Sequence, residues 1–274
     1  MKPLYRAHTQ IERFAQWTPM RTVLQRRYEK EFAANLKSNL FRGVFDSFDA
    51  AQASAPATRP VGYDNSDSAS MYRQRTQRIY AHDYPVIYWL NKLLSASQNR
   101  VLDLGGHIGV SYYAYRKYLD YPAGLSWTVH DVPAVMARGR ELAREMDDTG
   151  QLHFCDRFED CSDPGIVMAL GSLQYLPDTL PERLLKLKSL PRHLILNLMP
   201  IHLQKTYFTL QSIGTAFCPY RISAMDEFVK SFEALGYQLV DRWENPEKSC
   251  PIPFHPGHSL DRYHGFLFSL AQPN

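Results

Sequence analysis

The stretch Arg100–Tyr113 decides the fold, and it reads Arg-Val-Leu-Asp-Leu-Gly-Gly-His-Ile-Gly-Val-Ser-Tyr-Tyr. A short apolar run ends in a cluster of glycines, and an aromatic segment of helical character follows. This order is typical of a buried parallel strand, a tight turn and a helix whose N-terminus meets a ligand. Glycine suits such a turn because it accepts positive φ and because a ligand can approach its backbone without meeting a Cβ atom.

Strand-like and helix-like segments alternate after this turn. Short apolar runs predict strands at 125–130, 152–154, 165–170 and 193–198. Amphipathic patterns predict helices at 133–146 and 181–190. This alternation predicts an α/β fold, with a mostly parallel sheet and helices on both of its faces.

The C-terminal part changes character. Residues 207–211 are predicted to form a short strand, and 213–221 a loop that contains Gly and Pro. Ser223 is a suitable N-cap for the next helix, and Gly236 ends that helix. Two strands are then predicted to close the chain, at 237–243 and 263–270.

The residues before the glycine turn are predicted to be an accessory segment, with a boundary between 1–98 and 99–274. Two short helices are expected within 1–40, and an aromatic cluster surrounds Gly43. From 66 to 98 the pattern is helical, with a break at Pro85. This helical part is expected to lie over the glycine turn as a lid, with plain coverage of one sheet face as the alternative.

The composition is that of an ordinary globular protein and excludes several functions. A net charge of +3, with the basic residues scattered, argues against nucleic acid as a partner. Arg73, Arg75 and Arg78 come closest to a cluster, and a solvated helix face is favoured over a role in binding a substrate carboxylate. No run approaches the roughly 18 apolar residues of a membrane span. Four cysteines without a CxxC pair indicate free thiols, so a soluble cytoplasmic protein is expected.

Candidate site residues stand where the predicted strands end. In an open α/β sheet, ligands bind at the carboxyl ends of the strands, where the topology reverses. These ends carry Asp103–Gly109, Asp131, Asp156 and Gly171–Tyr175. A carboxylate at Asp131, after the second strand, can accept hydrogen bonds from both hydroxyls of a ribose. This combination predicts a cofactor that contains adenosine.

The spacing of the glycines separates two such cofactors. A dinucleotide site uses G-x-G-x-x-G, which Gly105, Gly106 and Gly109 do not match. An NAD-dependent oxidoreductase is therefore disfavoured. The pattern resembles instead the first motif of class I S-adenosylmethionine methyltransferases, acid-x-G-x-G-x-G. Asp103, Gly105 and Gly109 match that motif, and His107 replaces its middle glycine.

Further motifs carry the resemblance over most of the chain, from about Phe41 to Phe268. Phe41-x-Gly43-Val44-Phe45, Val101–Gly106, Leu173–Pro177 and Tyr263–Phe266 are similar to a small bacterial group of methyltransferase-like proteins, which neighbours the azetidine-2-carboxylate synthases. The resemblance implies a Rossmann-like class I methyltransferase fold with an antiparallel C-terminal strand. It also implies that 99–274 is the catalytic domain and that S-adenosylmethionine is the cofactor.

The resemblance also implies the roles of individual residues. The methionine end of the cofactor would be bound by Asp103, Gly105, Gly106, His107 and Gly109. The ribose would be bound by Asp131 with Val132, and the adenine would be bound by Asp156 with Arg157. Gly171 would bind the cofactor. Ser172, Gln174 and Tyr175 would face the sulfonium as candidate catalytic residues, and an aromatic ring there can stabilise a cation by about 0.5–2 kcal/mol.

Histidines offer few further candidates. His202, just after a predicted strand, is the candidate general base. His255 and His258 lie in a Pro-rich segment without a third ligand nearby, so a surface loop is favoured over a metal site. His130 is expected to be a hydrogen-bonded, buried residue.

The main hypothesis is an S-adenosylmethionine-dependent methyltransferase that acts on a small molecule, in secondary metabolism, without a metal. The alternative is a cyclase, an azetidine-2-carboxylate synthase, in which the α-amine of S-adenosylmethionine attacks its own γ-carbon and releases methylthioadenosine. An aromatic cavity built from the N-terminal segment, including Trp17 and Tyr63, and from 208–220 would serve that reaction. A third hypothesis is a protein that binds the cofactor without catalysis. A homodimer stays open as an assembly.

Overall fold

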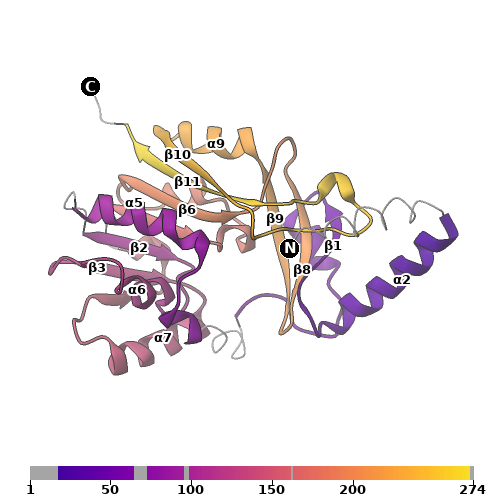
Figure 1. Cartoon of the computed structure of the whole chain (residues 1–274), viewed down its shortest axis with the longest axis horizontal. Coiled ribbons are helices and arrows are strands. Elements are labelled where there is room, and N and C mark those ends of the chain that lie inside the picture. The colour runs from indigo at the N-terminus through magenta and orange to yellow at the C-terminus, as the bar shows by residue number, and fades with distance from the viewer. Residues whose placement is uncertain (1–17, 65–72, 96–98, 162, 272–274) are drawn as a thin grey trace.

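The computed structural model describes residues 18–64, 73–95, 99–161 and 163–271. Its main feature is a seven-stranded sheet with the order β10-β11-β6-β5-β2-β3-β4 (Figure 1). The strands are β2 (Arg100–Leu104), β3 (Ser126–His130), β4 (Leu152–Phe154), β5 (Ile166–Leu170), β6 (His193–Met199), β10 (Tyr237–Asn245) and β11 (Tyr263–Leu270). β2 to β6 pair in parallel, whereas β11 is antiparallel to both β6 and β10. The predicted Rossmann-like fold with an antiparallel C-terminal strand is confirmed.

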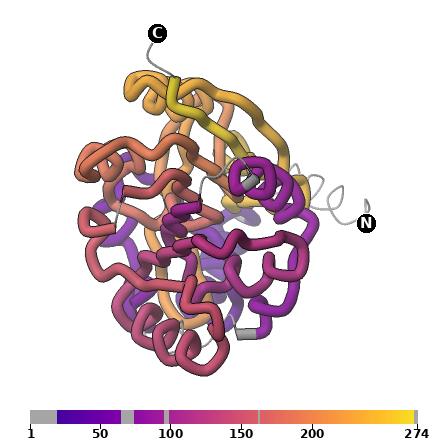
Figure 2. Tube along the Cα trace, turned by 90° about the vertical axis from the view of Figure 1, so that its left-hand side faces the viewer, coloured from indigo at the N-terminus to yellow at the C-terminus, as the bar shows by residue number. Residues whose placement is uncertain are grey.

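Helices cover both faces of this sheet because its strands are apolar on both sides. Val101 of β2 belongs to one buried cluster, and its neighbours Leu102 and Leu104 belong to the other. On the first face lie α5 (Tyr84–Ser95), α6 (Val110–Tyr115) and α7 (Pro133–Met146). On the second lie α8 (Leu180–Leu184) and α9 (Met225–Glu233). Figure 2 shows the chain from the side, with the sheet between these helices.

A second sheet stands beside the first and was not expected from the sequence. Its order is β1-β8-β9-β7, with β1 (Ser38–Phe45), β7 (Ile201–His202), β8 (Tyr207–Ile213) and β9 (Phe217–Ala224). β8 forms a hairpin with β9 and pairs on its other side with β1 from the N-terminal part. The accessory segment is therefore more than the predicted helices, because one of its strands completes a sheet with residues after β6.

The structure specifies one local prediction in this region and corrects two. The aromatic cluster around Gly43 lies in strand β1, where Gly43 has φ +76° and the register shifts between Arg42 and Phe45. The predicted loop at 213–221 is largely β9, which tolerates Pro219 because β7 pairs with β9 only at its end. Ser223 belongs to β9, and Ala224 is the residue that precedes α9.

The remaining elements are short, apart from α2. They are α2 (Thr18–Ala34), α3 (Phe48–Ala53), η1 (Arg73–Gln77), η2 (Ala81–Asp83), η3 (Phe158–Asp160), η4 (Leu173–Tyr175) and η5 (Pro256–His258). α2 extends away from the central sheet on the side of the second sheet (Figure 1). No helix in the described ranges combines the length and apolarity that crossing a bilayer requires.

The helical segment predicted over 66–98 is seen from residue 73 to 95. α5 begins at Tyr84 with Pro85 in its first turn, as the break at that proline predicted. The segment is tied to the sheet at β6, where Asn197 Nδ2 donates a hydrogen bond to His82 O at 2.8 Å. η1 packs against α6, the helix that follows the glycine turn. Residues 65–72, 96–98 and Trp17 lie outside the described residues.

Candidate functional site

The glycine turn after β2 is tightly packed. Gly105 has φ +76°, and its N–H donates a hydrogen bond to His130 O at 2.8 Å. A Cβ atom on Gly105 would lie 2.2 Å from Ser172 Cβ, and one on Gly106 would lie 2.5 Å from Asp103 Cγ. Both separations are far below contact distance, so neither position accepts a side chain without movement. The turn therefore brings the ends of β2, β3 and β5 into contact.

His107 stands in this turn with a left-handed backbone. Its φ is +56°, and 5% of its surface is exposed. Its N–H donates a hydrogen bond to Asp131 Oδ2 at 2.8 Å, and its ring lies 6.2 Å from that of Tyr63, centroid to centroid. A residue with a Cβ atom occupies this backbone region at a cost of about 1–2 kcal/mol. The glycine of the family motif is thus replaced without loss of the turn.

Asp131 faces the turn from the end of β3. Its Oδ2 accepts from the N–H of His107, and its Oδ1 accepts from the N–H of Val132 at 2.7 Å. Burial raises the pKa of this carboxyl, and the two backbone hydrogen bonds oppose that shift. Each carboxylate oxygen has a second lone pair, so Asp131 can still accept hydrogen bonds from two hydroxyl groups.

Asp103 lies beneath Gly106 and has 1% of its surface exposed. Burial raises the pKa of this carboxyl to about 7, against the hydrogen bond that Trp127 Nε1 donates to Oδ2 at 3.3 Å. The neighbouring charge of Asp131 also raises the pKa. Near neutral pH the Asp103 carboxyl is therefore divided between its neutral and charged forms, and a cation nearby would favour the charged one.

The loop after β5 is joined to the turn through Ser172. The Ser172 hydroxyl donates a hydrogen bond to Leu104 O at 2.5 Å, and Gly171 before it has φ +94°. The buried Gln174 amide donates from Nε2 to Gly171 O at 2.8 Å. Ser172 and Gln174 thus hold the shape of the loop, and the residue that follows them is Tyr175.

Tyr175 connects this loop to the second sheet. Its hydroxyl donates a hydrogen bond to Gln211 Oε1 at 2.8 Å, and its ring packs edge-on against Tyr220 at 5.1 Å. Tyr63 and Tyr175 both pack on one small buried cluster of the second sheet, made of Ile213, Ala216 and Cys218. Aromatic side chains of the second sheet and of the N-terminal part therefore border the end of β5.

Tyr63, which the sequence predicted as part of an aromatic cavity, belongs to a segment that is hydrogen-bonded to the second sheet. Gly62 N–H donates a hydrogen bond to Phe217 O at 2.9 Å, and Phe217 N–H donates to Pro60 O at 2.9 Å. Asp64 Oδ1 accepts from Ala134 N–H at the start of α7, at 3.1 Å. The segment links β9 to the residues that follow Asp131. Asp64 was missed because it lies far in sequence from the helix whose amide it binds.

Asp156 and Arg157 follow β4, next to β3, and both are exposed. Asp156 Oδ1 pairs with Arg140 at 2.7 Å, and 74% of its side chain is exposed. The Arg157 guanidinium lies 3.8 Å from Glu159 and 3.7 Å from Asp160. These two residues therefore stand at the rim of the sheet edge, whereas the turn, Asp131 and Ser172 lie at its centre.

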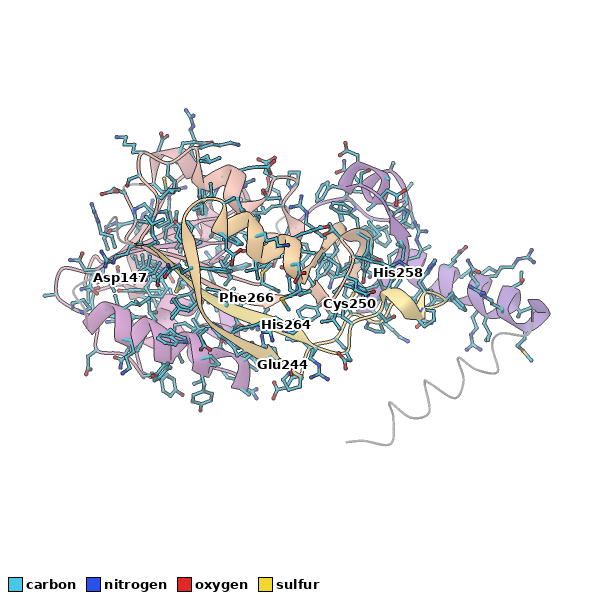
Figure 3. All side chains as sticks on the ribbon, turned by 90° about the horizontal axis from the view of Figure 1, so that it is seen from above. Asp147, Glu244, Cys250, His258, His264 and Phe266 are labelled. Carbon is cyan, nitrogen blue, oxygen red and sulfur yellow. The ribbon has the colours of Figure 1, made fainter. Side chains whose placement is uncertain are left out.

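His202, the candidate general base, has hydrogen-bond partners at both ring nitrogens. Its Nδ1 accepts hydrogen bonds from the N–H groups of Gln204 and Lys205, and its Nε2 lies 3.3 Å from Gly257 O. Both ring nitrogens are thus engaged in holding a turn. The neighbour of Gly257, His258, lies well apart from Asp147, on the side of α2 (Figure 3).

His130 and the four cysteines are also of residue types that can bind metals or act in catalysis. His130 Nδ1 is hydrogen-bonded to Cys155 O at 2.9 Å as predicted, but the residue is half-buried rather than buried. All four cysteines are free thiols. Within the described ranges, no three His, Cys, Asp or Glu side chains come together in a way that could hold a metal ion.

Comparisons with known proteins find likeness in structure. No protein-family model matches the sequence, and neither does any curated protein sequence. The CcbJ methyltransferase from Streptomyces caelestis aligns over 77% of this chain and 98% of its own, with 15% identity and a TM-score of 0.48. Magnesium protoporphyrin IX methyltransferase (ChlM) from Synechocystis PCC 6803 aligns over 76% and 96%, with 12% identity and a TM-score of 0.47. The glycopeptide N-methyltransferase MtfA aligns over 76% and 98%, with 13% identity and a TM-score of 0.48.

Proposed function

We propose that the chain binds S-adenosylmethionine at the carboxyl ends of β2, β3 and β5 and transfers its methyl group to a small molecule. The observation that carries this proposal is the direct contact between the glycine turn, Asp131 and the Ser172 loop. These groups meet between β2 and β5, where the order of the parallel strands reverses. This is the position at which open α/β sheets bind nucleotide-like ligands.

The residues fit the chemistry of that cofactor. Asp131 has free acceptor capacity for the two ribose hydroxyls. Asp103, with its pKa near 7, gains its charge most readily beside a cation. The α-ammonium group of the methionine end would supply that cation above the turn. Asp156 and Arg157 stand at the rim, on the side of β4, where we assign the adenine.

S-adenosylmethionine supplies a methyl carbon on a sulfonium, which is a good leaving group. The task left to the chain is to hold the acceptor in line with that carbon and to exclude water. We assign Tyr175 to the side of the sulfonium, because it ends the loop that Ser172 fastens to the turn. Its aromatic face would stabilise the cation by about 0.5–2 kcal/mol.

Cyclisation of S-adenosylmethionine is the second candidate function, and the position of Asp103 favours it. The α-ammonium must lose a proton before its nitrogen can attack the γ-carbon. A buried carboxyl with a pKa of about 7 next to the methionine end is suited to take that proton. The reaction needs no acceptor, and the aromatic residues that border the end of β5 would then serve to fold the methionine tail.

One experiment separates these functions. The purified protein is incubated with S-adenosylmethionine alone and then with candidate acceptors, and products are identified by mass spectrometry. S-adenosylhomocysteine that appears only with an acceptor supports the methyltransferase. Methylthioadenosine and a four-membered amino acid from the cofactor alone support the cyclase. Calorimetric binding without either product supports a cofactor-binding protein.

The ribose assignment is tested by Asp131→Ala. The loss of the ribose hydrogen bonds is expected to weaken cofactor binding by about 1–3 kcal/mol, which is about 5- to 150-fold in Kd. Asp148→Ala is the matched control, because that carboxylate is exposed and pairs with Arg116 away from the turn. Calorimetry gives both affinities, and an unchanged Kd in Asp131→Ala would refute the assignment.

A further inference from the structure

Two of the four thiols lie against the same backbone carbonyl. Cys155 Sγ is 3.0 Å from Arg157 O, and Cys161 Sγ is 3.5 Å from the same oxygen. The Cys155 thiol is also among the groups that raise the pKa of Cys161, as expected of neighbouring thiols. Cys155 directly follows β4 and Cys161 follows η3, so the pair closes the short loop between them. Both sulfurs therefore lie within 3.5 Å of one oxygen atom, so the two side chains point into the same small region.

The remaining cysteines have no such partner. Cys218 packs in the cluster of the second sheet that borders Tyr63 and Tyr175. Cys250 packs in another cluster of that sheet and lies far from Asp147, the residue whose carboxylate holds the N–H of Leu152 at the start of β4 (Figure 3). Both are buried, and burial raises the pKa of the Cys218 thiol to about 12. They therefore serve as internal controls for thiol chemistry.

The two thiols of the pair differ in access. Cys155 is partly exposed, and it is the single cysteine of the four that is not buried. Cys161 has 5% of its surface exposed, and burial and the neighbouring Cys155 raise its pKa. An oxidant in solution therefore reaches Cys155 first, because nucleophilic attack requires an accessible thiolate.

We propose that Cys155 and Cys161 form a reversible disulfide that weakens the binding of the cofactor's adenine end. The Cys155 thiolate attacks glutathione disulfide, which forms a mixed disulfide and releases one glutathione thiolate. That thiolate takes the proton of Cys161, whose sulfur then attacks Cys155 and releases the second glutathione. The protein loses two protons and two electrons, and glutathione disulfide gains them as two molecules of glutathione.

The effect on the cofactor rests on the function proposed above. Asp156 and Arg157, assigned to the adenine, are enclosed by the two cysteines. Oxidation removes both S–H donors from Arg157 O and shortens the separation of the sulfurs to about 2.05 Å. Cys155 O is held by His130, and Asp156 is held by Arg140. The covalent bond replaces the two hydrogen bonds to Arg157 O, so the acceptor and donor groups of the loop shift relative to β3.

Formation of the disulfide is tested without any cofactor. The full chain is equilibrated with mixtures of reduced and oxidised glutathione, and free thiols are then blocked by alkylation. Trypsin cleaves after Arg157, so a disulfide between the two cysteines joins peptides 145–157 and 158–183. We expect that linked pair in the wild type and Cys218→Ser, and its absence from Cys155→Ser and Cys161→Ser. Alkylation of Cys155 and Cys161 to the same extent as in the fully reduced protein would overturn the proposal.

The effect on binding is a separate measurement. Oxidised wild type is expected to bind S-adenosylmethionine about 2- to 10-fold more weakly than reduced wild type, as for the loss of one hydrogen bond. Cys161→Ser, which cannot close the disulfide, should show the same Kd before and after treatment. If the linked peptides form and the Kd is unchanged, the regulatory role is wrong. If the reduced protein does not bind the cofactor, the proposed function fails, whereas the disulfide still stands on the peptide analysis.

Discussion

The two sheets of this molecule are stabilised in different ways. The central sheet lies between two clusters of apolar side chains, and residues of β2 alternate between them. The second sheet contains buried polar groups, among them Asn35, Thr209, Gln211 and Ser212. Burial of apolar surface is non-directional, whereas a buried polar group must find a particular partner. Apolar burial contributes to both sheets, and in the second sheet the hydrogen bonds of these buried polar groups also fix the register.

The largest expected difference in stability is between alanine substitutions at two glycines with positive φ, one beside each sheet. Gly105→Ala places a Cβ atom 2.2 Å from Ser172 Cβ, in a turn fixed by three strand ends. We expect it to lower the free energy of unfolding by about 3 kcal/mol or more and to abolish cofactor binding. Gly214→Ala, at φ +85° in the β8–β9 hairpin with nothing within 4 Å of the new atom, should cost about 1 kcal/mol. Denaturant unfolding measures both, and equal losses would contradict the packing argument.

The polar core of the second sheet is tested by Asn35→Ala. Asn35 Nδ2 donates a hydrogen bond to Ala216 O at 2.9 Å, and its Oδ1 accepts from Gly214 N–H at 2.8 Å and from the Ser212 hydroxyl. Removal of this side chain leaves buried groups without partners and should cost about 2–3 kcal/mol. Hydrogen exchange is expected to quicken in β8 and β9 and to stay slow in β2 and β3.

Thr58→Ala is the control for that variant. The exposed Thr58 hydroxyl donates a hydrogen bond to Ala33 O, near the end of α2, the helix that Asn35 follows. An exposed substitution of this kind should change stability by less than about 0.5 kcal/mol. If Asn35→Ala quickens exchange in β2 and β3 as much as in β8 and β9, then the two sheets unfold together and the contrast between them is wrong.

The central sheet could be predicted from the sequence because its signals are local. The apolar runs of β2 to β6 each lie within a few residues, and the predicted helix over 133–146 has the bounds of α7. β1 and β9 could not be recognised in this way. In these two strands the alternation of apolar and polar residues is interrupted by Gly43 and Pro219. The strand that pairs with β1 is β8, which comes after the parallel strands of the central sheet in the sequence.

The same difference between local and long-range signals applies to the candidate site. Asp103, Gly105, Asp131 and Ser172 could be grouped from the sequence, because parallel strand ends meet at one edge of a sheet, and the structure places these residues side by side. His202 was chosen for its place after a strand, and the sequence carries no sign that Gln204 and Lys205 would donate to its ring. Gln211 accepts a hydrogen bond from the Tyr175 hydroxyl. This contact was missed because Gln211 lies in the second sheet, which was not predicted.

The buried carboxyl of the central sheet should make stability depend on pH. Burial raises the pKa of Asp103 from 3.8 to about 7. For a carboxyl whose pKa is raised on folding, the stability it contributes is complete below the unfolded pKa and is lost as the pH rises through the folded one. We therefore expect the free energy of unfolding of the wild type to fall between about pH 4 and pH 7, by at most about 1.4 kcal/mol per pH unit.

Asp103→Asn isolates this effect, because the amide has nearly the same shape and does not titrate. Denaturant unfolding between pH 4 and pH 8 should give a flatter profile for the variant than for the wild type. The nearby Asp131, whose pKa is also raised by burial, leaves part of the slope in place. Identical slopes in the two proteins would show that Asp103 is ionised throughout, and the argument for it as a proton acceptor in cyclisation would fail.

The smallest expected effect belongs to His107, where the turn departs from the family motif. His107→Gly relieves a left-handed backbone at φ +56° but removes a buried ring that faces Tyr63. The two contributions oppose each other, so the net change in unfolding free energy should be within about 1 kcal/mol. His107→Ala removes the same ring and keeps the strain, so it should be less stable than the glycine variant by about 1 kcal/mol. In both variants the backbone N–H still donates to Asp131, and the affinity for the cofactor should be retained. A large loss of affinity in both, with stability intact, would instead give the imidazole itself a role in binding.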